Sequence, residues 1–270
     1  MSNEIFVSFL KKVFSFFEED NRSLERPRFL FRGMKEGVPL CASISEMKEI
    51  ECPYKADKAM FELFKKKIMK SPFYKEKESL LGENDWDLIS LARHYGLSNR
   101  YLDWTSDWRV ALWFAIHTWK KGLPSLATSD EQSVIWVLKT EEVDFVEIKN
   151  NSSPFPQRRD GKTKIFKTKN GIRRVDNQCS FMMRQVYVYK DGVRTCNSRD
   201  LFLEEVDKNP VFDGRVHKIK IDSLDVELLD KFLQEQKINY DYLFPDEEEL
   251  ESVEIGKIVE ECKQEYLSKK

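Results

Sequence analysis

The segment 88–115, LISLARHYGLSNRYLDWTSDWRVALWFA, constrains the fold of this 270-residue chain more than any other. Its first part has apolar residues at helical spacing, and Gly96 stands where a glycine commonly ends a helix. Residues 100–104 then run extended, and Thr105 or Ser106 begins a second helix with an apolar inner face. A helix end, a strand and a helix start must therefore lie close together. Binding and catalytic residues are commonly found on loops that such a rigid scaffold positions.

The rest of the chain alternates between helical and extended patterns. Helical spacing of apolar residues predicts helices over 4–19, 55–70 and the acidic stretch 246–270. A further helix is expected to begin after Asp222 or Ser223, which would be its cap. Apolar or alternating runs predict strands over 29–31, 134–138, 181–189 and 215–221. Because these strands are scattered among helices without a regular βαβ rhythm, they predict an α+β fold: a mixed, largely antiparallel sheet flanked by helices. We expect a single domain over 1–270, with an amphipathic N-terminal helix and an acidic C-terminal one.

Composition excludes several classes of protein. The 19 Phe, 9 Tyr and 6 Trp residues supply enough apolar surface for a core, which excludes wholesale disorder. The net charge of −2 gives no bulk attraction to polyanions. The cysteines form no CxxC pair and the histidines lie far apart, so we expect reduced thiols and no metal site. Without a signal peptide or an apolar run of ~20 residues, we expect a cytoplasmic protein with no membrane partner.

Several side chains of the 88–115 segment are suited to holding a ligand. Thr105 offers a hydroxyl and backbone N–H groups at a helix N-terminus, which is a natural anion site. Tyr95 and Trp104 are suited to stacking on a planar ring. Buried tryptophans in a polar core network, with His94 as a helix-terminal cation, are the alternative interpretation of the same residues.

Two arginines are candidates for holding a phosphate. Arg32 ends the predicted strand 29–31 and Gly33 follows it, so the guanidinium can face an anion while the backbone comes close. A surface arginine and a turn glycine are the alternative. We expect Arg100 to pair with Asp103, which would orient its guanidinium.

These stretches together resemble the FRG domain, a bacterial family named for its Phe/Tyr-Arg-Gly motif. Phe31-Arg32-Gly33 is similar to that motif. RHYGLSNRYLDWT at 93–105 is similar to the family's QHYGLPTRLLDWT, and ALWFA at 111–115 is similar to the helix that follows. Asn177-Gln178 with Phe181, and YLFPDEEEL at 242–250, resemble later segments of the family, so the resemblance covers a core of about residues 27–250.

The chain departs from the family pattern at a few positions. Arg93 stands where Gln is usual, and Ser98-Asn99 replace Pro-Thr. Cys179 replaces the glycine that usually follows Gln178, a position that often needs φ > 0.

The resemblance implies a function in bacterial phage defence or as a toxin. A weaker resemblance, to ADP-ribosyltransferases, implies an ADP-ribosyltransferase-like fold with NAD as the substrate. It implies that Arg32 with Gly33 contacts the NAD phosphates, in a binding site completed by His94, Tyr95, Arg100, Trp104 and Thr105. The acidic E-x-E turn of those enzymes has no match here, which leaves Asp103 and Gln178 as the candidate catalytic residues.

The role of the basic stretch and the class of function remain open. The basic stretch 158–174, RRDGKTKIFKTKNGIRR, indicates either a solvated hairpin, a nucleic-acid contact or a flap that gathers phosphate over Arg32. For the function, we expect one of three classes. The first is an NAD-dependent ADP-ribosyltransferase or NAD glycohydrolase with a protein or nucleic-acid acceptor, and the second is a non-catalytic module that binds a nucleotide or nucleic acid. An aromatic core whose charged ends dock partner proteins is the third interpretation.

Overall fold

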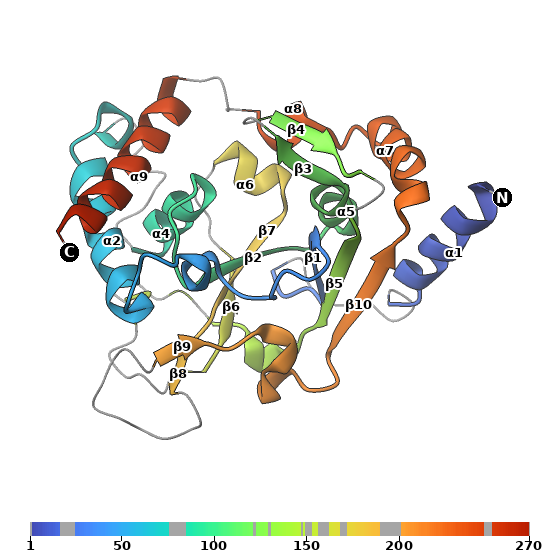
Figure 1. The fold of residues 1–270 in the computed structure, drawn as a ribbon, viewed down its shortest axis with the longest axis horizontal. Coiled ribbons are helices and arrows are strands. Elements are labelled where there is room, and N and C mark those ends of the chain that lie inside the picture. The colour runs from blue at the N-terminus through green and yellow to red at the C-terminus, as the bar shows by residue number, and fades with distance from the viewer. Residues whose placement is uncertain are drawn as a thin grey trace.

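The computed structural model describes residues 2–16, 25–75, 85–120, 123–128, 131–146, 148, 153–155, 162–167, 172–189, 201–245 and 250–269. Figure 1 shows strands at the centre of the molecule, with helices gathered on both sides of them.

A six-stranded sheet forms the centre of the described structure. In spatial order its strands are β10 (Val216–Ile221), β5 (Ser133–Lys139), β1 (Phe29–Lys35), β2 (Tyr101–Thr105), β7 (Ser180–Arg184) and β6 (Lys164–Phe166). Every pairing in this sheet is antiparallel. The prediction of an α+β fold with a largely antiparallel sheet is therefore confirmed.

Helices cover both faces of the sheet (Figure 1). On one side lie α2 (Pro53–Ile68), α4 (Asp85–His94) and α9 (Leu250–Ser268). On the other side lie α1 (Ser2–Phe14), α5 (Trp108–Ile116) and α7 (Val226–Glu235). The smaller elements are α6 (Arg173–Asn177), α8 (Tyr240–Leu243), the hairpin of β3 (His117–Lys120) with β4 (Leu123–Leu126), and the pair β8 (Tyr187–Tyr189) with β9 (Leu201–Leu203).

The alternation of side chains along β1 divides the core into two layers. Phe29 and Phe31 pack with α1, α5 and α7, whereas Leu30 packs with α2, α4 and α9. Successive residues of a strand point to opposite faces, so Arg32 shares the face of Leu30 and Gly33 shares that of Phe31.

The helix α4 ends as its sequence predicts. The Gly96 backbone has φ of +91°, which glycine adopts at little cost. The Leu97 N–H donates to the Ala92 carbonyl at 2.8 Å and the Gly96 N–H to the Arg93 carbonyl at 2.9 Å. These two hydrogen bonds close the helix and turn the chain into β2.

Two predicted helix and strand ends are wrong. β1 does not end at Arg32 but continues to Lys35, because its whole length pairs with β5. Neither Thr105 nor Ser106 caps α5: Thr105 is the last residue of β2, and the Asp107 carboxylate accepts from the Arg109 N–H at 2.9 Å. The cap falls later because the sheet ladder holds Thr105 opposite Ser180.

Other predicted boundaries also shift. The stretch 181–189 forms two strands instead of one, because Gln185 interrupts it and its buried amide donates to the Glu204 carbonyl at 2.8 Å. A short 3-10 helix occupies Ser223–Asp225, so Asp225 and not Asp222 or Ser223 precedes α7. The helical spacing of apolar residues in 246–270 predicts that Val253 points inward, but in α9 this residue is exposed. None of the described helices is long and apolar enough to cross a bilayer.

Candidate functional site

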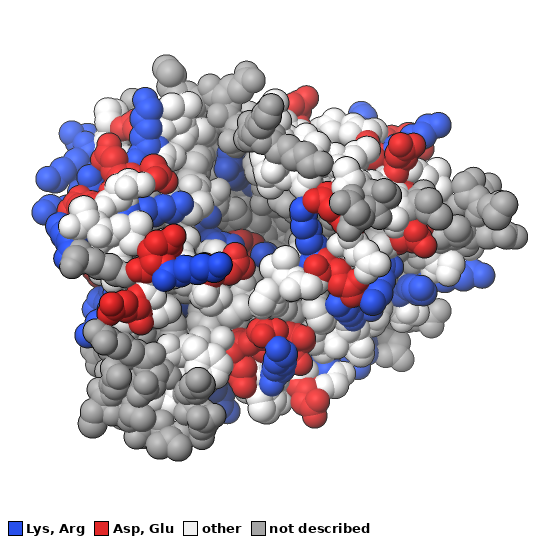
Figure 2. Space-filling view, viewed as in Figure 1, with Lys and Arg blue, Asp and Glu red and all other residues white. Residues whose placement is uncertain are grey.

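A cavity of about 670 Å³ opens where β1 and β2 separate. The two strands share one register pair, Phe31 opposite Thr105, although each pairs along its whole length with its other neighbour. The cavity is lined by the middle of β1, by the ends of β2 and α4, by α5 and by parts of α6, β7, α9 and the β3 strand. Figure 2 shows this face of the molecule hollowed near its centre.

Arg32 and Gly33 contribute to the cavity in different ways. A Cβ at Gly33 would lie 1.8 Å from the Ala111 carbonyl oxygen and 2.5 Å from the Ala115 amide nitrogen, so only glycine lets α5 pack this closely on β1. The neighbouring Arg32 points to the opposite face, where it lines the cavity. Arg32 thus supplies a positive charge to the cavity, and Gly33 allows the close contact between β1 and α5.

Arg32 is half-buried, and its guanidinium has no carboxylate partner among the described residues. Its Nη1 donates to the Asp103 backbone carbonyl at 2.7 Å, while its Nε is buried and has no hydrogen-bond partner among the described residues. In the part of the chain that the structure describes, no carboxylate lies within ion-pair distance of it. Burial lowers the pKa of Arg32 to about 10, so the side chain still carries its charge at neutral pH.

Asp103 is the one acidic residue among the described residues that line the cavity. Its Oδ2 accepts from Arg93 Nε at 2.8 Å, and Arg93 Nη1 donates to Ser43 Oγ at 2.6 Å. Burial raises the pKa of Asp103, but the charges of Arg93, His94 and Arg32 together outweigh that effect and hold it below 3.8, its ordinary value. The carboxylate is therefore ionised, and its Oδ1 is buried with no hydrogen-bond partner in the described structure.

Arg174 adds a third guanidinium to the cavity lining. It lies in α6, its Nη1 donates to the His94 carbonyl at 3.2 Å, and its guanidinium carbon lies 4.5 Å from the centre of the Tyr95 ring. The Tyr95 hydroxyl in turn lies 3.0 Å from Ser252 Oγ of α9. Stacking on aromatic rings leaves the edge of a guanidinium open to hydrogen bonding.

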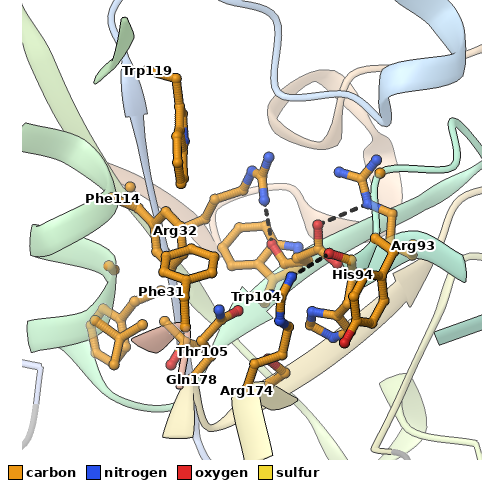
Figure 3. A pocket seen from close by; sticks show the side chains of 18 of the residues that line it. Phe31, Arg32, Arg93, His94, Trp104, Thr105, Phe114, Trp119, Arg174 and Gln178 are labelled. Carbon is orange, nitrogen blue, oxygen red and sulfur yellow. Dashed lines mark hydrogen bonds and ion pairs between the residues drawn. The ribbon is translucent and has the colours of Figure 1, made fainter. Parts of the chain in front are cut away.

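Aromatic side chains line the other end of the cavity. Figure 3 shows Phe114 and Trp119 on one side, Arg93 and His94 on the opposite side, and Arg32 between them. The ring of Phe244 lies 6.1 Å from that of Phe114 and 5.5 Å from that of Trp119, centre to centre. The cavity therefore has an apolar, aromatic end and a charged end.

The structure brings together all but one of the residues predicted for the site. The residues that line the cavity are Arg32, Gly33, His94, Tyr95, Asp103, Trp104, Thr105 and Gln178. The Gln178 side chain donates to the Leu243 carbonyl at 3.1 Å, which ties the β7 end to α8. Its neighbour Cys179 has φ of +46°, as the usual glycine of that position would lead one to expect.

Arg100 lies outside the cavity, and its predicted pairing with Asp103 is wrong. Arg100 Nε forms an ion pair with the fully buried Asp57 of α2, and the guanidinium packs 4.6 Å from the centre of the Tyr187 ring. The reason is geometric: Arg100 and Asp103 are three residues apart on extended chain, so their side chains point to opposite faces.

Several residues of the cavity lie outside the site predicted from the sequence. Arg93 was noted as a departure from the FRG pattern, and its place next to His94 at the α4 end was the available signal. Trp119 had no such signal, because it comes from the β3 strand. Phe244 lies in the YLFPDEEEL segment that resembles the family, but it was not predicted for the site. Arg174 belongs to the basic stretch 158–174, most of which lies outside the described residues, so the predicted contact with nucleic acid and the predicted flap stay predictions.

Comparison with known proteins identifies part of the chain. The family model of the FRG domain matches residues 27–122, which include β1, α4, β2 and α5 and thus most of the cavity wall. No curated protein and no solved structure matches the chain, so the ADP-ribosyltransferase likeness stays a prediction. In the described residues, no three His, Cys, Asp or Glu side chains are grouped as a metal site requires. Residues 27–122 of this chain match the FRG domain, and the cavity is built on the Phe-Arg-Gly strand and the HYGL and LDWT segments of that stretch.

Proposed function

We propose that the cavity binds a nucleotide through its phosphate groups, and that NAD is the ligand. The observation that carries this proposal is the half-buried Arg32 side chain, whose guanidinium lines the cavity without a carboxylate partner in the described structure. Removing one partner of a buried ion pair costs about 3–5 kcal/mol, because it leaves an uncompensated charge. A phosphate offers the missing charge and accepts the guanidinium N–H groups at the same time.

The charge balance of the cavity supports the same ligand class. Its described lining contains Arg32, Arg93 and Arg174 but one carboxylate, Asp103. Arg93 is engaged by that carboxylate, which leaves an excess of positive charge in a partly closed space. Such an excess favours an anionic ligand, since screening by water is weak there.

The unpartnered acceptor of Asp103 favours a ligand that also carries hydroxyl groups. Its ionised Oδ1 is an acceptor without a donor among the described residues, close to the Arg32 side chain that contacts its own backbone carbonyl. A ribose hydroxyl beside a phosphate satisfies the acceptor and the guanidinium together. The sugar phosphate of a nucleotide provides this combination, and the volume of about 670 Å³ lies within the range of small-molecule sites.

We further propose that Asp103 makes the protein an NAD glycohydrolase or an ADP-ribosyltransferase. In this reaction the bond between ribose C1′ and the nicotinamide nitrogen breaks, and its electron pair leaves with nicotinamide. Positive charge develops on the ribose, where an ionised carboxylate stabilises it. An oxygen of water, or of a protein or nucleic-acid acceptor, then bonds to C1′ and releases its proton. The FRG resemblance favours a setting in phage defence or toxicity.

Calorimetric titration with NAD and measurement of nicotinamide release in a cell lysate test these proposals together. We expect Arg32→Ala to weaken NAD binding by about 10- to 150-fold, the usual effect of losing a charged hydrogen bond. Arg26→Ala is the matched control, because that arginine pairs with Glu142 outside the cavity. Asp103→Asn is expected to keep NAD binding and to abolish release.

Each outcome decides between the alternatives. A folded wild-type protein that binds no NAD refutes the proposed ligand. Binding without release, in wild-type protein with lysate present, refutes the catalytic proposal and supports a non-catalytic nucleotide-binding module. Thermal melting of each variant shows whether a lost function reflects the cavity or a lost fold.

A further inference from the structure

Trp119 differs from every other tryptophan of the chain in its exposure. Its side chain is 50% exposed, whereas the other five tryptophans are buried or half-buried. A single exposed apolar residue is common on protein surfaces and requires no explanation by itself. Trp119, however, also lines the cavity, where a large exposed ring is available to a ligand.

The surroundings of Trp119 hold its ring at the mouth of the cavity. The ring centre lies 5.5 Å from that of Phe244 at an interplanar angle of 86°, and 6.1 Å from that of Tyr240 at 68°. Such edge-to-face contacts fix the orientation of an aromatic ring. They tie the β3–β4 pair to the end of α8, where the centre of the Phe244 ring also lies 5.3 Å from the Arg174 guanidinium carbon.

The position of Trp119 fits the geometry of a nucleotide. Figure 3 shows Trp119 beyond Arg32, on the side away from Arg93 and His94. A ligand whose phosphate binds Arg32 and whose ribose meets Asp103 has a third part, the base, which must leave the charged end. The aromatic end, with Phe114, Trp119 and Phe244, is the apolar surface available to it.

We infer that Trp119 is the residue that stacks on the base and so selects nucleotides over other phosphorylated sugars. This inference rests on the proposed phosphate site at Arg32 and adds the specificity that Arg32 alone does not provide. Stacking on an aromatic side chain accepts any planar base, so Trp119 distinguishes ligands with a base from ligands without one.

Calorimetric titration with AMP, nicotinamide mononucleotide and ribose 5-phosphate tests this inference, because the three share a ribose 5-phosphate and differ in the base. We expect at least one of the two nucleotides to bind wild-type protein about 5- to 150-fold more tightly than ribose 5-phosphate. Trp119→Ala is expected to remove this preference and to leave the affinity for ribose 5-phosphate unchanged. Trp119→Phe, which keeps an aromatic face, is expected to retain most of it.

Leu123→Ala is the matched control: Leu123 is 65% exposed on the same hairpin but does not line the cavity. It is expected to bind all three ligands as the wild-type protein does. A preference that survives Trp119→Ala overturns the inference and leaves the phosphate site standing. An equal loss of all three ligands in Trp119→Ala also overturns it, because Trp119 then supports the cavity as a whole. If wild-type protein binds none of the three, the phosphate site itself is refuted.

Discussion

The Arg32 side chain bonds to the Asp103 backbone across the gap between β1 and β2, with 2.7 Å from Nη1 to the carbonyl oxygen. Neighbouring strands normally satisfy such a carbonyl with a backbone N–H. Here the strands separate after the pair of Phe31 and Thr105, and the guanidinium takes over that role. Arg32 therefore donates a hydrogen bond to a carbonyl that lost its backbone partner, and it presents a positive charge to the cavity that the separation creates.

Arg93→Ala is expected to raise the pKa of Asp103. Arg93 is the nearest cation, with Nε 2.8 Å from Oδ2, and it makes the largest of the contributions that lower this pKa. Titration of the Asp103 carboxyl carbon by NMR, with Asp103→Asn to assign the signal, measures the change. Arg109→Ala, whose guanidinium pairs with Asp107, is the control and is expected to leave Asp103 unchanged. An unchanged pKa in Arg93→Ala would contradict the proposed balance of charges.

The same pKa gives the pH dependence of stability a definite sign. Because the pKa of Asp103 is lower in the folded protein than its ordinary 3.8, the ionised carboxylate stabilises the fold above about pH 4. That contribution decreases as the pH falls through the native pKa. In urea unfolding between pH 3 and pH 6, Asp103→Asn is therefore expected to lose less stability on acidification than the wild-type protein. A steeper loss in the variant would refute this.

Gly33→Ala is expected to destabilise the protein by about 3 kcal/mol or more, because the added methyl group overlaps the backbone of α5. Gly256→Ala is the matched control: a Cβ at Gly256 in α9 meets nothing within 4 Å. Alanine is the better helix former, so this control is expected to gain about 0.5–1 kcal/mol. Chemical denaturation measures both, and a Gly33→Ala variant as stable as wild type would exclude the close packing.

Asp57→Ala is expected to destabilise the fold by about 3–5 kcal/mol, because it leaves the Arg100 guanidinium buried without its partner. Restoring charge balance with Asp57→Ala combined with Arg100→Met should recover part of that loss. Thermal or urea unfolding gives both values. A double variant less stable than Asp57→Ala would mean that the aromatic rings around Arg100 need the guanidinium itself.

Cys179→Gly is expected to stabilise the protein by up to about 1 kcal/mol. The Cys179 backbone has φ of +46°, which costs an L-residue about 1–2 kcal/mol and glycine almost nothing. The greater flexibility of glycine in the unfolded chain offsets part of the gain. Cys179→Ala keeps the strain and is the control, so equal stabilities of the two variants would reject this account.

Local patterns accounted for most of the secondary structure. The 3.6-residue spacing of apolar side chains located α2, and Gly96 located the end of α4. Helix starts were predicted less well: the hydroxyl of Thr105 looked like a cap, but the pairing of β2 with β7 placed that residue in the sheet. A cap depends on where a strand stops pairing, and this is not a local property of the sequence.

The kinds and order of the elements, and most residues of the cavity, could be predicted because helix and strand periods and the FRG motifs are local patterns. The pairing of the buried charges, in contrast, depends on the folded arrangement of the elements. That arrangement set Asp57 against Arg100 and Arg93 against Asp103, since the partner of a buried charge is chosen by the face on which each side chain falls. It also brought Trp119 and Arg174 from distant segments to the gap between β1 and β2, a place that exists because two neighbouring strands stop pairing.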